Sequence, residues 1–386
     1  MSGLSQAGLD RWRATMTAHV ERGSVPGLVA LVSRNGETHV HTAGLQEVGG
    51  VPMARDTIFR ISSMTKPVTA VAAMILVEEC RLRLDDPVDD LLPELADPQV
   101  LRSLDSPVDD TVPARGPITV RHLLNSTFGH GLIMAAPGTY PIQDALAELG
   151  LTPGPPAPAS TPDADEWLRR LGSVPLLAHP GETWRYDTAY DVLGILVSRA
   201  AAQPFEEFLR ERVFEPLGMV DTGFFVPAAD LSRFATAYSG DSVFDPPAGQ
   251  WSSAPAFFSG RGGLVSTVDD YFAFGRMMLD GGVLSRLSLR TMTMDQLNAG
   301  QKVGGELTPG FFKSFGWGFG VSVVTRQDAV DKVPGRFGWS GGFGTSSAMD
   351  PLCGMVSVLM SQRAWESPGG PDVYRDFLTT AYAAVE

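Results

Sequence analysis

The sequence predicts an α+β protein in which one sheet is assembled from the two ends of the chain. Strand patterns occur before residue 62 and again after residue 316, helical patterns fill most of residues 83–231, and there is no internal repeat. At 386 residues, the chain suits one extended domain or two closely connected ones. We therefore expect a sheet region at 1–82 and 232–386, a mostly helical region at 83–231, and a functional site in the cleft between them.

The amino-terminal segment predicts a surface helix and a β-hairpin. Apolar residues recur at helical spacing over 9–21, and the pattern stops before Gly23. Residues 27–33 and 38–43 have strand composition and are separated by Arg-Asn-Gly at 34–36, a sequence typical of a tight hairpin turn. A further short strand is expected at 57–61.

From residue 62 to Glu78 the chain is rich in apolar residues and has few polar side chains. Its Ala, Val, Met, Ile and Leu residues do not alternate with polar ones. A helix that is apolar nearly all round lies inside a protein. We therefore expect a buried helix here.

The middle of the chain alternates helices with irregular loops. Two stretches rich in Pro, Gly and Ser are expected to be loops, at 151–165 and 239–263. The predicted helices are at 88–92, 120–124, 166–171, 190–199 and 205–213. Strand patterns then return, followed by a closing helix at 373–384; the expected strands are 318–324, 335–339, 346–349 and 355–360.

Charge and cysteine content exclude several functions. The 44 acidic against 30 basic residues give a net charge of −14, which disfavours nucleic acid and anionic membrane surfaces as partners. Two distant cysteines and scattered histidines support neither a disulfide framework nor a metal site. The first 23 residues contain charges throughout and do not resemble a signal peptide, so we expect a cytoplasmic protein. The sequence has neither a P-loop nor a dinucleotide-binding fingerprint, and we expect no cofactor.

Lysine usage singles out Lys66. Only four of the 30 basic residues are lysines, and Lys66 is the only one in the first 301 residues, at the start of the buried helix. Arginine keeps its proton in proteins, whereas burial can lower the pKa of a lysine until it acts as a base. Lys66 is therefore predicted to be a proton acceptor.

Ser63 precedes Lys66 by three residues, so the two side chains share a face of the helix. An amine in hydrogen-bond reach activates a serine nucleophile. The first turn also offers free N–H groups and the positive end of the helix dipole to an oxyanion. The same spacing also fits a capping serine followed by an unrelated lysine, but the buried helix favours the catalytic interpretation.

Tyr186 and a glycine-rich segment complete the candidate site. Tyr186 follows a Pro-Gly turn and precedes an apolar helix, so its phenol can point into a cleft and exchange protons with the serine and the leaving alcohol. The segment 335–345 contains five glycines, whose small size lets a strand edge approach a ligand and offer an N–H to an oxyanion.

This segment also matches G-x-S-x-G around Ser340, the nucleophile elbow of α/β-hydrolases. That motif requires a following helix and a later histidine. All six histidines precede Ser340 and no apolar helix follows it, so we reject the elbow.

With Ser63-x-x-Lys66, Tyr186 and the glycine-rich segment at Trp339-Ser340-Gly341 in this order, the chain resembles class C β-lactamases and penicillin-binding-protein-like serine hydrolases, and most closely the family VIII carboxylesterases. Besides Ser63-x-x-Lys66 and Tyr186, typical segments of that superfamily are ITVRHLL at 118–124, FEPLGM at 214–219 and GWGFG at 316–320. The resemblance covers nearly the whole chain. It implies the β-lactamase/transpeptidase-like fold, an antiparallel sheet flanked by helices with a mostly helical second region.

The resemblance also implies roles for individual residues. Ser63 would be acylated, Lys66 and Tyr186 would be the base system, and the N–H groups of Ser63 and Gly342 would form the oxyanion hole. Substrate contacts would come from Trp339, Ser340, Gly341, Asn125 and Thr188.

Two positions depart from the β-lactamase pattern. Thr188 replaces the asparagine of Y-x-N, and Trp339 replaces the Lys or His that begins the third motif. An indole cannot pair with the carboxylate of a β-lactam as an ammonium does. The esterase branch tends to have tryptophan here, so we expect an esterase acting on small neutral esters; the alternatives are a β-lactamase or D-amino peptidase, and an acyltransferase that uses the same acyl-enzyme.

Overall fold

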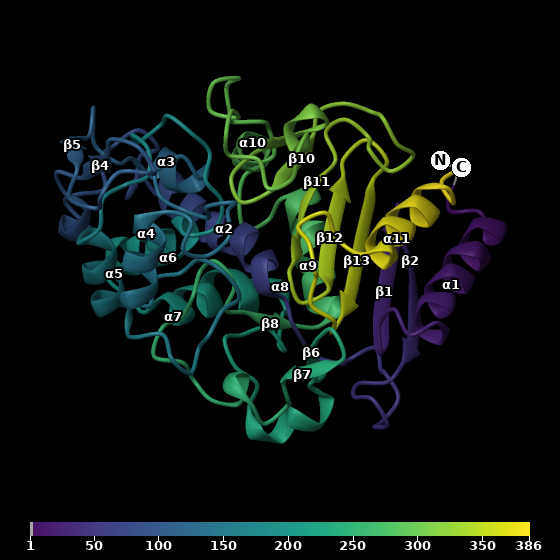
Figure 1. Ribbon diagram of the computed structural model, residues 1–386. Coiled ribbons are helices and arrows are strands. Elements are labelled where there is room, and N and C mark those ends of the chain that lie inside the picture. The colour runs from purple at the N-terminus through teal and green to yellow at the C-terminus, as the bar shows by residue number, and fades with distance from the viewer. Residues whose placement is uncertain (1–2) are drawn as a thin grey trace.

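A computed structural model describes residues 3–386 and contains a seven-stranded antiparallel sheet (Figure 1). Its strands come from the two ends of the chain, as the sequence predicts, and the fold is β-lactamase/transpeptidase-like. In spatial order they are β2 (Glu37–Gly44), β1 (Gly27–Arg34), β13 (Met355–Ser361), β12 (Thr345–Asp350), β11 (Phe337–Gly341), β10 (Ser322–Val324) and β9 (Phe315–Trp317).

The first hairpin forms at the predicted Asn-Gly turn. Asn35 and Gly36 both have positive φ, 51° and 89°, which this tight turn requires. The register then pairs Arg34 with Glu37 and Leu28 with Ala43. β1 is buried, and its other edge pairs with β13, so the amino- and carboxyl-terminal parts of the chain join inside the sheet, one strand from its β2 edge.

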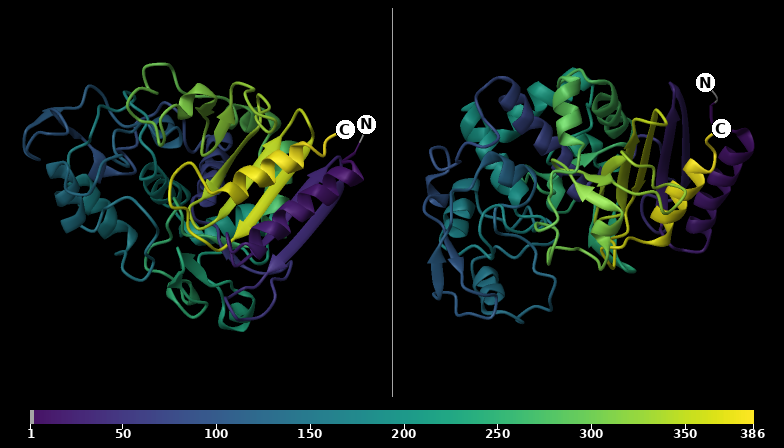
Figure 2. Two further views of the ribbon diagram at one scale, coloured as in Figure 1. Left: turned by 45° about the vertical axis from the view of Figure 1, so that its right-hand side comes forward. Right: turned by 90° about the horizontal axis from the view of Figure 1, so that it is seen from above.

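Helices cover both faces of this sheet. α1 (Gln6–Glu21) and α11 (Asp372–Tyr382) pack together on one face, where Figure 2 shows them side by side. α9 (Val268–Asp280) packs against the opposite face, and α2 (Thr65–Glu78) lies beyond it next to the helical region. The larger hydrophobic core therefore joins the sheet to the helical region, and a smaller core lies under α1 and α11.

The remaining elements lie mostly between residues 83 and 292, and all of them except α6 are short. None of the seven strands of the main sheet falls within 83–231. The helices are α3 (Val120–Leu124), α4 (Pro141–Glu148), α5 (Ala164–Gly172), α6 (Ala189–Ala201), α7 (Phe205–Leu209), α8 (Glu215–Leu217) and α10 (Arg286–Met292). Pairs of short strands are β3 (Phe59–Arg60) with β8 (Val265–Ser266), β4 (Gln99–Leu101) with β5 (Thr111–Pro113), and β6 (Ala237–Ser239) with β7 (Ser242–Asp245).

Two predicted elements are wrong, and the segment 239–263, predicted to be a loop, contains the short strand β7. Residues 88–92 form turns instead of a helix, because prolines at 87 and 93 leave only five residues between them and a residue before proline avoids helical geometry. Residues 318–324 are not one strand, because Gly320 (φ 79°) turns the chain between β9 and β10. The sequence prediction also missed α4, α9 and α10.

Within residues 3–386, we find no helix with the length and apolar character needed to cross a bilayer.

Candidate active site

Ser63 lies where a short 3-10 turn (Ser62–Met64) leads into the buried helix α2. Ser62 has a φ of 45°, which places it in the left-handed region that residues with a side chain rarely adopt. The chain therefore turns sharply just before Ser63. Both serines line a cleft, whereas every residue of α2 from Thr65 to Leu76 is buried. The buried helix thus holds the serine at the wall of the cleft.

The end of β11 reaches this turn because residue 341 is glycine. A Cβ at Gly341 would lie 2.2 Å from the carbonyl oxygen of Ile61, closer than such atoms approach. The hydroxyl of Thr345 donates to the same oxygen at 3.2 Å. Gly342 and Ser63 consequently line one cleft, which brings together the two residues predicted to supply the oxyanion hole.

Lys66 is fully buried; its Nζ lies close to oxygen atoms of Ser63, Arg261 and Asp187 and also interacts with the side chain of Tyr186. It lies 2.9 Å from Ser63 Oγ, 2.7 Å from the carbonyl oxygen of Arg261 and 2.8 Å from Asp187 Oδ1. The contact with Ser63 is the one that the i,i+3 spacing predicts. The contacts with Asp187 and Arg261 come from distant parts of the chain.

The expected lowering of the pKa of Lys66 is wrong. Burial does favour the neutral amine, but the Asp187 carboxylate, followed by Tyr186, outweighs burial and raises the pKa of Lys66. The pKa of Asp187 is lowered: burial would raise it, but Lys66 and Arg261 more than compensate. Both shifts favour the charged forms of Lys66 and Asp187.

Asp187 belongs to a buried network of two acids and two bases. Arg261 Nη1 lies 2.5 Å from Asp187 Oδ2, and Arg261 Nε lies 2.7 Å from Asp191 Oδ2. Asp187 has a φ of 95°, which directs its side chain from the turn before α6 toward Lys66 at some cost in backbone strain. Sequence reasoning missed the roles of Asp187, Arg261 and Asp191. Asp187 is adjacent to Tyr186, but no spacing rule links either residue to Lys66 or Arg261.

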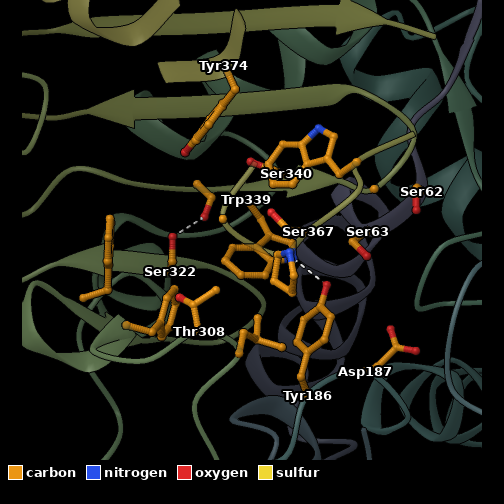
Figure 3. Close-up of a pocket in the computed structure, with 18 of the residues that line it drawn as sticks. Ser62, Ser63, Tyr186, Asp187, Thr308, Ser322, Trp339, Ser340, Ser367 and Tyr374 are labelled. Carbon is orange, nitrogen blue, oxygen red and sulfur yellow. Dashed lines mark hydrogen bonds between the residues drawn. The ribbon is translucent and has the colours of Figure 1, made fainter. Parts of the chain in front are cut away.

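Tyr186 lies between Lys66 and Trp339. Lys66 Nζ is 4.5 Å from the centre of the phenol ring, and Trp339 Nε1 donates a 2.7 Å hydrogen bond to the phenol oxygen. Figure 3 shows this bond, with the phenol oxygen directed toward the region of Ser63. Trp339 also packs edge-on against Trp317, with ring centres 4.7 Å apart. The indole therefore fixes the position of the phenol as well as lining the cleft.

The cleft has a volume of about 600 Å³, and residues of both the sheet region and the helical region line it. Ser63, Tyr186 and Asp187 lie at one side, and Tyr374 of α11 at the other (Figure 3). Eight aromatic side chains contribute to the wall: Tyr186, Phe311, Phe315, Phe337, Trp339, Phe343, Trp365 and Tyr374. Such a cleft suits an apolar ligand with a few oriented polar groups.

The predicted substrate-contact residues divide into two groups. Trp339 and Ser340 line the cleft. Asn125 and Thr188 are buried and do not line it; the side-chain oxygen of Asn125 accepts a 2.6 Å hydrogen bond from Thr127. Gly341 does not line the cleft either; because it has no side chain, β11 can pack closely against the backbone of Ile61.

Ser340 does not lie in an elbow. It belongs to β11, which continues through a short turn into β12 and pairs with it, Ser340 lying opposite Ser346. The strand–turn–helix geometry of the α/β-hydrolase nucleophile is absent here. Ser63 Oγ, in contrast, lies 2.9 Å from the amine of Lys66, an arrangement in which an amine can activate a serine.

Fold and site together define a class of protein: a serine hydrolase whose serine and lysine lie at the start of a buried helix beside an antiparallel sheet. The family model described as Beta-lactamase matches residues 12–380, and the chain belongs to this family. It is 38% identical over 376 residues to Protein Rv1367c of Mycobacterium tuberculosis (strain ATCC 25618 / H37Rv), covering 92% of this chain and 90% of the relative. It is 34% identical over 378 residues to Esterase EstB of Burkholderia gladioli, covering 89% and 88%.

Among solved structures, the chain is similar to EstCE1, described as a hydrolase with promiscuous acyltransferase activity. The TM-score is 0.81 at 26% identity, and the match covers 98% of both chains. These similarities place the protein among the β-lactamase-like serine hydrolases and acyltransferases.

Proposed function

We propose that the protein is a carboxylesterase of the family VIII type that cleaves small neutral esters through an acyl-enzyme on Ser63. The observation that carries this proposal is the Ser63–Lys66 hydrogen bond at the wall of an aromatic cleft in which Trp339 occupies the position of the usual cation. An indole has no charge with which to meet a substrate carboxylate. The likeness to an esterase supports the same assignment.

The proposed reaction has two halves. Ser63 Oγ attacks the ester carbonyl while its proton passes to the base system of Lys66 and Tyr186, and the N–H groups of Ser63 and Gly342 stabilise the oxyanion. The alcohol leaves with a proton from the same system. Water then attacks the acyl group by the reverse sequence and frees Ser63.

A panel of p-nitrophenyl esters of increasing acyl length, with a chromogenic cephalosporin beside them, tests the proposal. We expect the esters to have the higher kcat/KM. A serine-directed phosphonate should label the peptide that contains Ser63, and Ser340→Ala should keep much of the activity while Ser63→Ala loses it. A wild-type preference for the cephalosporin would instead favour the β-lactamase alternative.

Acyl transfer is the second candidate. It is supported by the likeness to EstCE1 and by a cleft large enough for an acyl group and an acceptor alcohol together. Adding alcohols of increasing size to the ester assay distinguishes the two, because a transferase forms the new ester faster than the free acid. A cytoplasmic location stays a prediction.

A further inference from the structure

Gly342 is a glycine that the backbone does not require. Of the 42 glycines, all of which lie within residues 3–386, only Gly116 and Gly342 combine a φ outside the left-handed region with open space, since no heavy atom beyond the adjacent residues lies within 4 Å of a Cβ added there. The neighbouring glycines differ: a Cβ at Gly338 would lie 2.1 Å from the carbonyl oxygen of Ser347, and Gly344 has a φ of 102°. A side chain at residue 342 is therefore compatible with the fold.

The hairpin turn that contains Gly342 also accepts other residues at this position. The turn joins β11 to β12 and is closed by a 3.0 Å hydrogen bond from the N–H of Gly344 to the carbonyl oxygen of Gly341. Its two central residues, Gly342 and Phe343, both lack a positive φ, as in a type I turn. The second position of such a turn accepts most residues. The reason for the glycine therefore lies outside the turn.

The position of Gly342 in the cleft supplies a reason. Gly342 is exposed and lines the same wall as Ser63. Its carbonyl oxygen accepts a 2.8 Å hydrogen bond from the N–H of Trp365, which also lines the cleft. Gly342 thus connects the part of the cleft that contains Ser63 with the segment that begins near Trp365.

An aromatic arm of the cleft extends along this segment. We define the arm by five lining residues: Phe343, Ala364, Trp365, Pro368 and Tyr374. The ring centres of Trp365 and Tyr374 lie 5.3 Å apart, and a Cβ at Gly370 would lie 3.1 Å from each ring, so the two rings and this loop pack together. Tyr374 lies at the side of the cleft away from Tyr186 (Figure 3). The arm therefore offers apolar surface to a group that extends past Gly342.

The proposed reaction decides which half of the ester lies in the aromatic arm. The alcohol takes a proton from the base system as it leaves, so its oxygen lies beside Tyr186. The carbonyl oxygen lies against the N–H groups of Ser63 and Gly342. The acyl chain takes the remaining direction, past Gly342 and away from Tyr186.

We propose that Gly342 is a specificity-determining residue, whose missing side chain lets the acyl chain of a neutral ester pass the end of β11 into the aromatic arm. This inference rests on the proposed function and narrows its substrate class to esters of carboxylic acids with an extended apolar chain. A methyl group at residue 342 would meet no protein atom but would meet the acyl chain close to the carbonyl carbon. The side chain at this position therefore sets the size of the acyl group.

The test compares kcat/KM for p-nitrophenyl hexanoate and p-nitrophenyl acetate, which share a leaving group. The wild type should prefer the hexanoate. Gly342→Ala should lower the hexanoate-to-acetate ratio about tenfold, and Gly342→Val should lower it further, because one carbon more or less in an apolar pocket changes selectivity about 10- to 200-fold. A disturbance of the Gly342 N–H acts on both esters and cancels in the ratio.

Gly116→Ala is the matched control. It makes the same change at the other glycine with open space and an unrestricted φ, but residue 116 does not line the cleft. Its melting temperature and its hexanoate-to-acetate ratio should equal those of the wild type. In a second series, acetate esters of increasing alcohol size, Gly342→Ala should keep the wild-type order of preference, because the alcohol lies beside Tyr186.

Trp365→Ala tests the aromatic arm without changing the hairpin turn, and so keeps the proposal testable if Gly342→Ala does not fold. It should also lower the hexanoate-to-acetate ratio, because it removes apolar wall from the arm. An unchanged ratio in folded Gly342→Ala or in Trp365→Ala would overturn the proposal. A shift confined to the alcohol series, or a wild-type preference for acetate, would overturn it as well.

Failure of the esterase assignment is distinguishable from failure of this inference. p-Nitrophenyl esters of methyl- and hexylphosphonate label a serine by forming an Oγ–P bond with loss of p-nitrophenolate, so this labelling needs no ester turnover. Mass spectrometry of the peptide that contains Ser63 gives both labelling rates. The hexyl-to-methyl ratio should fall in Gly342→Ala and stay at the wild-type value in Gly116→Ala; an equal ratio in both variants would overturn the role of Gly342.

Discussion

Replacing Trp339 by phenylalanine separates two properties of this side chain, its ring surface and its N–H group. Phenylalanine keeps an aromatic ring against Trp317 and the cleft but cannot donate to Tyr186 Oη, which now lies 2.7 Å from the indole nitrogen. If the phenol of Tyr186 carries the proton of Ser63, the hydrogen bond from Trp339 stabilises the phenol oxygen in its charged form. Its loss should therefore act on the chemical step more than on binding.

The expected size follows from the bond itself. A hydrogen bond to a charged group contributes about 1.5–3 kcal/mol, and each 1.36 kcal/mol is tenfold in rate, so kcat should fall roughly 10- to 150-fold. KM should change little, because apolar contact with substrate is retained. The measurement is kcat and KM for a p-nitrophenyl ester, with melting temperature recorded to confirm folding.

Trp317→Phe serves as the control, since Trp317 packs on Tyr186 and Trp339 but makes no hydrogen bond to Tyr186 among the described residues. It should cost stability more than kcat. The reasoning is refuted if Trp339→Phe keeps kcat within twofold of wild type while Tyr186→Phe is inactive, because the bond would then play no part in catalysis. A rise in KM at constant kcat would assign Trp339 to substrate binding alone.

Three other substitutions test the site and its support. Lys66→Arg should lower kcat at least ~10²-fold although it conserves the positive charge, because a guanidinium cannot fit the enclosed space around the Lys66 amine. Near-normal activity of this variant would show that positive charge alone suffices. Gly341→Ala should reduce both kcat and the melting temperature, because its Cβ would collide with the carbonyl oxygen of Ile61. Overpacking of this kind lowers the free energy of unfolding by about 1–3 kcal/mol. An unchanged kcat would mean that the close approach of β11 to Ile61 does not position the site. Asp245→Asn should lower the free energy of unfolding, measured in urea, by about 3–5 kcal/mol, because it leaves the charge of the buried Arg60 guanidinium unpaired. A loss below about 1 kcal/mol would show that this buried ion pair contributes little to stability.

Local patterns in the sequence predicted the parts of the fold that depend on near neighbours. The Asn-Gly pair fixed the first hairpin, since a tight turn needs positive φ at successive residues. The unbroken apolar run predicted α2, and the i,i+3 spacing predicted the contact between Ser63 and Lys66. The same reasoning failed at 318–324, where Gly320 makes a turn inside what reads as one apolar strand.

The sequence alone determined which side chains are candidates for chemistry, because a helix turn or a strand pair fixes the relation between residues a few positions apart. Only the tertiary structure decided their electrostatic state and their neighbours. The carbonyl of Arg261 is 195 positions from Lys66 in the chain, and Trp339 is 153 positions from Tyr186, yet each makes a direct hydrogen bond. The pKa of Lys66 therefore moves opposite to the direction expected from burial alone: the Asp187 carboxylate, brought to 2.8 Å by folding, outweighs the desolvation that the sequence could anticipate.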